Sequence, residues 1–112
     1  MRSLIEAVRD QKALLYVSWI NVGEMYYITR RRRGAKLAED MLQDLRGLPI
    51  TLCPPTEERI LAAARLKAQH PLSYADAFAV ALAQEFGAVL VSGDPEFRAV
   101  ELVVTMMWLP EK

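Results

Sequence analysis

Hydrophobic residues recur along the chain with two kinds of spacing, and the alternation between them predicts the elements of the fold. Spacing of three and four residues predicts helices over residues 2–12, 19–32, 35–46, 57–69 and 74–86. Short continuous apolar runs between these helices predict strands over residues 14–17, 50–53, 88–91 and 103–109. Ser18 and Ser73 are typical residues for the start of a helix, and Gly34 and Gly87 for its end.

The strands indicate the class of fold. Strands that are apolar throughout and separated by helices are typical of a parallel sheet with both faces covered. We therefore predict a single three-layer α/β/α domain with a parallel sheet over residues 1–112. Ligands of such sheets bind beyond the carboxyl ends of the strands, so the loops after Val17 and Val91 are the expected site.

Composition narrows the classes of function. The chain has 112 residues, 53% of them hydrophobic, which suffices for one core and excludes a disordered tail. Its 14 basic and 14 acidic residues cancel, so a basic surface over the whole protein is excluded. With one cysteine, Cys53, and one histidine, His70, the chain excludes an internal disulfide, a cysteine zinc site and a histidine-rich metal site, and we expect no serine–histidine–aspartate triad. Carboxylates remain as the candidate catalytic groups.

The same residues bear on location. Arg2 and Glu6 follow Met1 too closely for the apolar segment of a signal peptide. The longest apolar run, residues 77–83, is far shorter than a membrane-spanning helix. A single cysteine fits a reducing compartment. We expect a cytoplasmic protein that does not bind a membrane.

Glu24 is the first of three acids in apolar surroundings. On a helical wheel it lies beside Ile20, Tyr27 and Ile28. A carboxylate within an apolar stripe costs free energy unless it is paired, hydrogen-bonded or bound to a cation. The alternative is a glutamate at the edge of the stripe, whose carboxylate reaches solvent or an arginine of residues 30–33.

Asp76 is the only charged residue between Ala75 and Ala83. A helix that is apolar on all sides is typically buried, yet this one carries an acid in its first turn. One interpretation is a capping box, in which Asp76 accepts a hydrogen bond from the Ser73 N–H. The other is a ligand for a cation, and the two interpretations are compatible.

Asp94 directly follows a predicted buried strand, in the sequence Ser92-Gly93-Asp94-Pro95-Glu96. As an N-cap, with Pro95 at the first helical position, it would only begin a short helix. As a ligand, it would stand at the carboxyl end of a strand, where the sites of α/β proteins form. Glu96 is a further candidate acid in the same turn.

Together, Glu24, Asp76 and Asp94 are expected where three elements meet at one end of a parallel sheet. Clustered carboxylates repel one another, so a hard cation would stabilise the arrangement. Oxygen ligands without histidine or cysteine favour Mg²⁺ or Mn²⁺ over zinc. Such a site supports hydrolysis of a phosphodiester, because the cation activates water and stabilises the leaving oxygen.

Three segments carry a resemblance to a known family: residues 18–27 (SWINVGEMYY), 71–78 (PLSYADAF) and 90–97 (LVSGDPEF). They resemble the PIN domain, and in particular the VapC-type toxin ribonucleases of toxin–antitoxin pairs, in a match over about residues 2–109. The resemblance implies an endoribonuclease that depends on Mg²⁺ or Mn²⁺. It also implies three partners: an RNA substrate, a cognate antitoxin protein, and a second copy in a homodimer or higher oligomer.

The resemblance also implies a role for each matching residue. Glu24, Asp76 and Asp94 match the catalytic, metal-binding acids of the pocket. Glu96 matches an auxiliary acid, and Ser92 matches a position where the family usually has threonine, whose hydroxyl supports the site.

One feature of the family has no counterpart in this sequence. PIN domains begin with a buried strand that carries an aspartate near its end, and Asp10, on the polar side of the first predicted helix, does not match it. We therefore expect a PIN-like domain without its first strand and without one of the four usual pocket acids. The alternative function is a catalytically impaired PIN module that binds a protein or antitoxin, and a third is a helical interaction module whose acids are only caps.

Two weaker features remain open. Arg30, Arg31, Arg32 and Arg33 are consecutive, and as cations at the end of a helix they suit both the helix dipole and solvent. They would alternatively contact the RNA backbone or an acidic segment of the antitoxin. Residues 106–108 (MMW) are interpreted as core and sheet edge.

Overall fold

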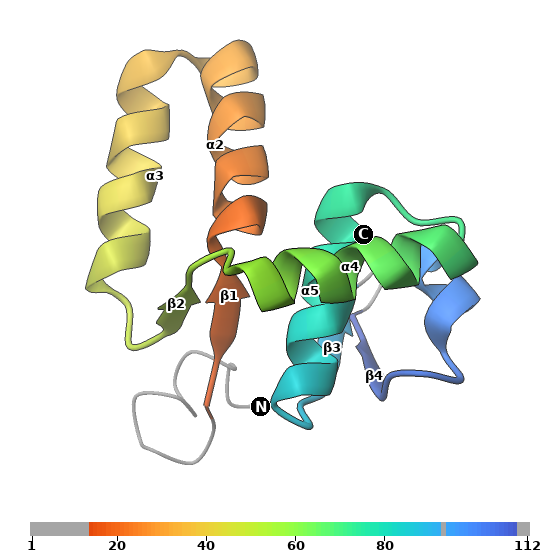
Figure 1. The fold of residues 1–112 in the computed structure, drawn as a ribbon. Helices are drawn as coiled ribbons and strands as arrows, with labels where there is room; N and C mark the ends of the chain where they lie inside the picture. Colours follow the sequence, from red (N-terminus) through yellow and green to blue (C-terminus); the bar gives the residue numbers. More distant parts are fainter. Residues whose placement is uncertain (1–13, 93, 110–112) are drawn as a thin grey trace. The chain divides into compact units, whose positions relative to one another are not determined.

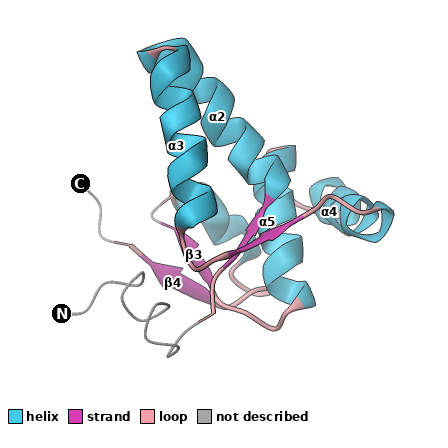
Figure 2. Ribbon diagram, turned by 90° about the vertical axis from the view of Figure 1, so that its left-hand side faces the viewer, coloured by secondary structure: helices cyan, strands magenta, loops and turns pink. Residues whose placement is uncertain are grey.

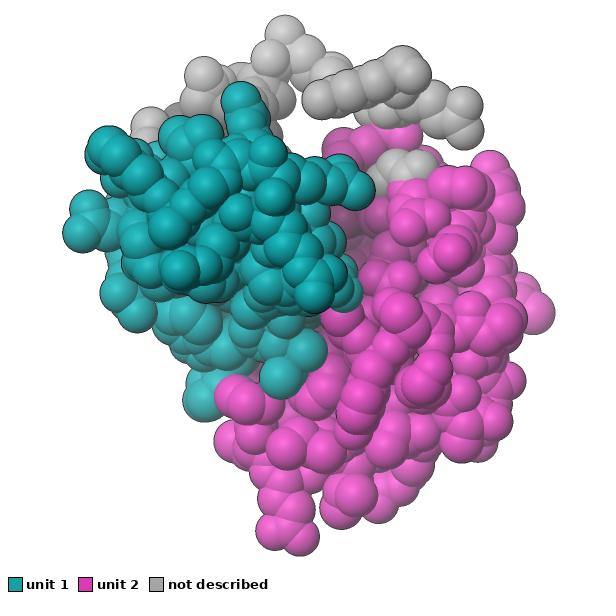
Figure 3. Space-filling model, turned by 90° about the horizontal axis from the view of Figure 1, so that it is seen from above, with its two compact units in different colours: residues 1–54 teal, residues 55–112 magenta. Residues whose placement is uncertain are grey.

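The computed structural model describes residues 14–92 and 94–109. The chain divides into two compact units, Met1–Pro54 and Pro55–Lys112, which are coloured separately in Figure 3. The helix predicted over residues 2–12 lies outside the described residues.

Unit 1 holds a pair of parallel strands and a pair of packed helices. Its elements are β1 (Tyr16–Ser18), α2 (Trp19–Arg33), α3 (Ala35–Gly47) and β2 (Thr51–Cys53). Strands β1 and β2 pair in parallel, with Val17 opposite Leu52. Helices α2 and α3 run side by side as a hairpin (Figures 1 and 2). The buried residues Val22, Ala38 and Cys53 form the core of this unit.

Local signals in the sequence account for both ends of α2. The Ser18 hydroxyl accepts a hydrogen bond from the Ile20 N–H at 3.1 Å, which satisfies a donor that the first turn of a helix leaves without a partner. At the other end, Gly34 adopts φ 97°, a conformation that side chains disfavour, and its N–H donates to the Arg30 carbonyl at 3.0 Å. Both predicted boundaries of this helix are therefore confirmed.

Unit 2 repeats the combination of a parallel pair and packed helices. Its elements are α4 (Glu57–Gln69), α5 (Tyr74–Glu85), β3 (Leu90–Ser92), the 3₁₀ helix η1 (Pro95–Val100) and β4 (Met106–Trp108). Strands β3 and β4 pair in parallel, with Leu90 opposite Met106 and Ser92 opposite Trp108. Helices α4 and α5 pack against each other.

The core of unit 2 is built on α5, as its apolar sequence predicts. The buried residues of this helix are Ala77, Phe78, Val80, Ala81, Leu82 and Ala83. An ion pair joins the start of α4 to the end of α5, with Nε and Nη2 of Arg59 each 2.9 Å from an oxygen of Glu85. The hydrogen bonds from the Arg59 guanidinium lower the pKa of the Glu85 carboxyl below its ordinary value.

The fold class is confirmed as parallel α/β, with the strands arranged as two parallel pairs, one in each unit. The strands are shorter than predicted and shifted, and the last predicted strand, residues 103–109, is reduced to Met106–Trp108. Its first part turns instead, because the N–H groups of Val103 and Val104 both donate to the Val100 carbonyl, at 3.0 and 3.2 Å. No helix among the described residues is long and apolar enough to span a membrane.

Candidate metal centre

The N-terminus of α5 places Asp76. The Ser73 hydroxyl accepts a hydrogen bond from the backbone N–H of Asp76 at 3.2 Å, so Ser73 is the N-cap of this helix. The reciprocal bond of a capping box, from the Ser73 N–H to the Asp76 carboxylate, is absent among the described residues. The capping-box interpretation is therefore only half right, and the half-buried carboxylate of Asp76 is available to a ligand.

The turn after β3 places the other two acids. The Ser92 hydroxyl accepts a hydrogen bond from the Asp94 N–H at 3.0 Å. The Asp94 carboxylate in turn accepts one from the Glu96 N–H at 2.9 Å, with Pro95 at the start of η1. Asp94 is therefore an N-cap, as one interpretation of the sequence holds, and Ser92 fixes the backbone that carries it. One oxygen of Asp94 makes this bond, which leaves the other oxygen for a ligand.

These elements gather three carboxylates. One oxygen from each of Asp76, Asp94 and Glu96 lies within 4.8 Å of the other two. Asp76 is half-buried, and the other two residues are exposed at the surface of unit 2. Oxygens at this spacing can share one cation, and a set made only of carboxylates suits a hard divalent ion better than zinc.

Electrostatics favours a cation at this point. Like charges at this spacing repel by about 1 kcal/mol even in bulk water, and Asp76 has two acidic neighbours within 4.8 Å. The dipole of α5 offsets about 0.3–1 kcal/mol of this repulsion, because Asp76 lies in the first turn of the helix. The helix end therefore does not balance the repulsion by itself, and a divalent cation would.

Glu24 belongs to the other unit of the chain. It lies in α2, in unit 1, and its side chain is half-buried. Of the apolar residues expected around it, Tyr27 is 47% and Ile28 36% exposed, so the stripe is less buried than its sequence predicts. The cost of placing a carboxylate there is correspondingly lower, and the place of Glu24 in the site stays a prediction.

The four arginines occupy the last turn of α2 and are exposed. Arg30 donates a hydrogen bond to the Tyr26 hydroxyl at 3.0 Å, and that hydroxyl donates to Glu39 at 2.6 Å. The Arg31 guanidinium lies 5.2 Å from the centre of the Tyr27 ring. Two of the four are thus held by contacts within unit 1, which supports the surface interpretation without excluding a charged partner.

Comparison with known families shows to which protein family the chain belongs. The family model of the PIN domain matches residues 2–102. The chain belongs to the PIN domain family. Members of this family are commonly nucleases and generally depend on divalent metals, so an acidic cluster in a PIN domain fits a metal centre. A comparison with curated proteins finds no match.

One contact in this PIN domain has no signal in the sequence. The Arg98 guanidinium lies 4.9 Å from the centre of the Trp108 ring. The two residues come from η1 and β4, and neither a motif nor a helical spacing relates them. The interpretation of residues 106–108 as core and edge is half right, because β4 is a strand but Met107 and Trp108 are 52% and 36% exposed.

Proposed function

We propose that this PIN domain is a divalent-metal-dependent endoribonuclease that hydrolyses RNA phosphodiester bonds, and that it is the toxin of a toxin–antitoxin pair. The observation that supports the proposal most is the gathering of Asp76, Asp94 and Glu96 within 4.8 Å in a member of a nuclease family. Because the group consists of oxygen ligands, Mg²⁺ or Mn²⁺ is the expected cofactor.

The proposed roles rest on the acidic cluster and on the family. Asp76, Asp94 and Glu96 hold the cation, and Glu24, as the resemblance to the family implies, is a further catalytic and metal-binding acid. Ser92 supports the site through the Asp94 backbone. When bound, a divalent cation lowers the pKa of water and stabilises negative charge on the leaving oxygen. Carboxylate oxygens that are not ligands accept hydrogen bonds from the attacking water and orient it.

The proposed partners are RNA, an antitoxin and a second copy of the chain. The exposed arginines at the end of α2, Arg30 to Arg33, provide a basic surface that suits a phosphate backbone or an acidic segment of the antitoxin. Neutralising Arg32 and Arg33 is expected to weaken the salt dependence of RNA binding. Unchanged salt dependence would show that these residues do not contact the RNA backbone.

The direct test is cleavage of a labelled single-stranded RNA in the presence of Mn²⁺. We expect cleavage that EDTA abolishes, and that Asp76→Asn lowers at least about 100-fold, because the substitution removes a metal-binding charge with little change in shape. The matched control is Glu58→Gln, which removes a negative charge from the first turn of α4 and should leave cleavage unchanged.

The outcomes separate the candidate functions. Cleavage that persists in EDTA or in Asp76→Asn would contradict the metal-dependent mechanism. RNA or protein binding without any cleavage in Mn²⁺ would favour the alternative, a PIN module that binds a partner. Growth arrest on expression of the intact chain, relieved by Asp76→Asn, would support the role as a toxin.

A further inference from the structure

Trp108 lies beside the strand that leads into the acidic turn. In the parallel register of β3 and β4 it is the partner of Ser92, and the next residue, Leu109, donates its N–H to the Ser92 carbonyl at 2.9 Å. Neighbouring strands are about 4.8 Å apart, and registered partners present their side chains on the same face of the sheet. Trp108 is thus one strand spacing from the residue whose hydroxyl holds Asp94.

An arginine accompanies this tryptophan. Arg98 belongs to η1, the short helix that Asp94 begins, and its guanidinium lies 4.9 Å from the centre of the Trp108 ring. The Arg98 side chain is 69% exposed, and its pairing with Glu101 at 3.2 Å is a surface contact of small energy. A cation and an aromatic ring are therefore presented together, on the short helix that Asp94 begins and on the strand paired with β3.

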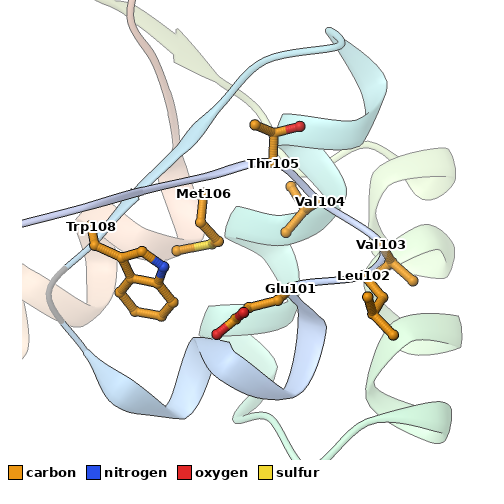
Figure 4. A pocket seen from close by; sticks show the side chains of 7 residues that line it. All are labelled: Glu101, Leu102, Val103, Val104, Thr105, Met106 and Trp108. Atoms are coloured by element: carbon orange, nitrogen blue, oxygen red, sulfur yellow. The ribbon is translucent and has the colours of Figure 1, made fainter.

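The surface at this place is hollowed and partly apolar. Figure 4 shows the side chains of Met106 and Trp108 on the same side of β4, around a hollow of about 540 Å³ that Glu101 also lines. Leu102, which also lines the hollow, is fully exposed and leaves apolar surface in contact with water. A ligand with a flat apolar group and a negative charge would stack on the ring and pair with the arginine.

We propose that Arg98 and Trp108 form a platform for one nucleotide of a single-stranded RNA, next to the bond that is cleaved. The base stacks on the exposed part of the Trp108 ring. The neighbouring phosphate pairs with Arg98 and replaces Glu101 as the partner of its guanidinium. The platform rests on the proposed function for its substrate. It adds a subsite that grips the RNA by stacking, without preference for one base.

Glu101 sets a limit on this subsite. Its carboxylate lies 3.2 Å from the Arg98 guanidinium, so it competes with a phosphate for Arg98 and repels the RNA backbone. Removing the charge with Glu101→Gln should therefore tighten the binding of RNA.

Fluorescence provides a test that does not need cleavage. Trp19 and Trp108 are the two tryptophans of the chain, so Trp19→Phe leaves Trp108 as the only one. In this variant, with EDTA present, we expect a single-stranded oligouridine of about twelve nucleotides to quench the emission. A strand of equal length with abasic sites should not quench it, because it offers phosphates but no bases to stack.

Two variants separate stacking from charge. Trp108→Leu should weaken binding of the oligouridine about tenfold and leave its salt dependence unchanged. Arg98→Gln should lower the slope of log K against log salt by about 0.7, the share of one phosphate contact on a single strand. In the cleavage assay with Mn²⁺, Trp108→Leu should raise KM and preserve kcat.

The matched control is Phe86→Leu. Phe86 is 40% exposed and also has an arginine near its ring, with Arg59 at 5.9 Å, but it caps the end of α5 opposite Asp76. Ten residues of helix separate the two, or about 15 Å. Binding and cleavage of RNA by Phe86→Leu should equal those of the parent chain.

Three results would overturn the platform. One is equal quenching by the abasic strand, and another is RNA binding by Trp108→Leu equal to that of the parent chain. The third is a change in Trp108 emission with protein concentration alone, which would make this surface an interface between copies. Because quenching is measured without metal, it tests the platform separately from cleavage. If RNA quenches Trp108 but is never cleaved, the platform is supported and the proposed nuclease is contradicted.

Discussion

The two units of this PIN domain are built alike, but only unit 2 gathers acids among the described residues. Each unit has a pair of parallel strands, a pair of packed helices and a helix that begins at a serine. Each also places an arginine near a tryptophan ring, at 5.7 Å in unit 1 and 4.9 Å in unit 2. The architecture that the two units share is therefore not enough to create an acidic metal site.

The difference lies in where each acid stands within its element. Asp76 is in the first turn of α5, Asp94 is the N-cap of η1 after β3, and Glu96 is in the first turn of η1. Glu24 is more than a full turn into α2, and it is the only acid of that helix. Acids at the ends of elements can meet, because several elements end at the same edge of the structure. An acid inside a helix can join a cluster only if another part of the chain brings further acids to it.

The largest expected effect contrasts the acids of the two units in the cleavage assay. Asp94→Asn should lower cleavage at least about 100-fold, because Asp94 is a proposed metal ligand and also begins η1. Glu24→Gln should lower it by about 10- to 100-fold, with more Mn²⁺ needed for half-maximal activity. Wild-type activity in Glu24→Gln, with normal metal dependence, would make Glu24 a glutamate of the helix surface.

A matched pair of core substitutions tests whether the units unfold together. Val22 in unit 1 and Val80 in unit 2 are both almost fully buried, at 1% and 0% exposure. Replacing either by alanine removes buried methyl groups and leaves a cavity, at a cost of about 2 kcal/mol. We propose a single domain, so both variants should shift one common unfolding transition in urea.

Two separate transitions would contradict the single domain. In that case Val22→Ala would move only one of them and Val80→Ala only the other. Circular dichroism follows the helices of both units, and the variant Trp19→Phe leaves fluorescence to report on unit 2 alone.

The predictable parts of this molecule are those that neighbouring residues determine. Ser18, Ser73 and Gly34 mark helix boundaries by hydrogen bonds and dihedral angles that involve only nearby backbone, and the structure confirms them. The ends of the short strands are less predictable from the sequence, because they depend on pairing with distant segments. Val104, for example, has the sequence of a strand and the hydrogen bonding of a turn.

The site divides in the same way. Asp76 and Asp94 could be singled out because a charge in an apolar helix, or after an apolar strand, is conspicuous in the sequence. Their approach to within 4.8 Å follows from tertiary packing, and so does the contact of Arg98 with Trp108. For Glu24, helical spacing predicted a buried stripe, but Tyr27 and Ile28 turn out to be exposed.

The N-caps offer a smaller contrast between the units. Ser18 is buried, with 4% exposure, whereas Ser73 is exposed. Ser18→Ala leaves the Ile20 N–H without its partner in a part-buried place and should cost about 1–2 kcal/mol. Ser73→Ala should cost about 0.5–1 kcal/mol, because water can replace the hydroxyl at the Asp76 N–H. Urea denaturation measures both, and equal losses would show that burial does not set the cost of these caps.

The smallest expected effect compares the ion pairs of the two units as the pH falls. In unit 2, Arg59 contacts Glu85 through two hydrogen bonds of 2.9 Å, and this lowers the pKa of Glu85 from its ordinary 4.5. A carboxyl whose pKa is lower in the folded state stabilises that state above its ordinary pKa. This stabilisation is lost as the pH falls below 4.5 and through the lower folded value.

Glu85→Gln should therefore be less stable than the parent chain near neutral pH, and the difference should vanish in acid. The Glu85 side chain is 40% exposed, so solvent screens the pair and the expected loss is a few tenths of a kcal/mol. The control is Asp40→Asn in unit 1, which breaks a single contact of 3.3 Å to a lysine that is 89% exposed. It should cost less than Glu85→Gln in urea denaturation at neutral pH. A larger loss for Asp40→Asn would mean that contact geometry does not determine the strength of these surface pairs.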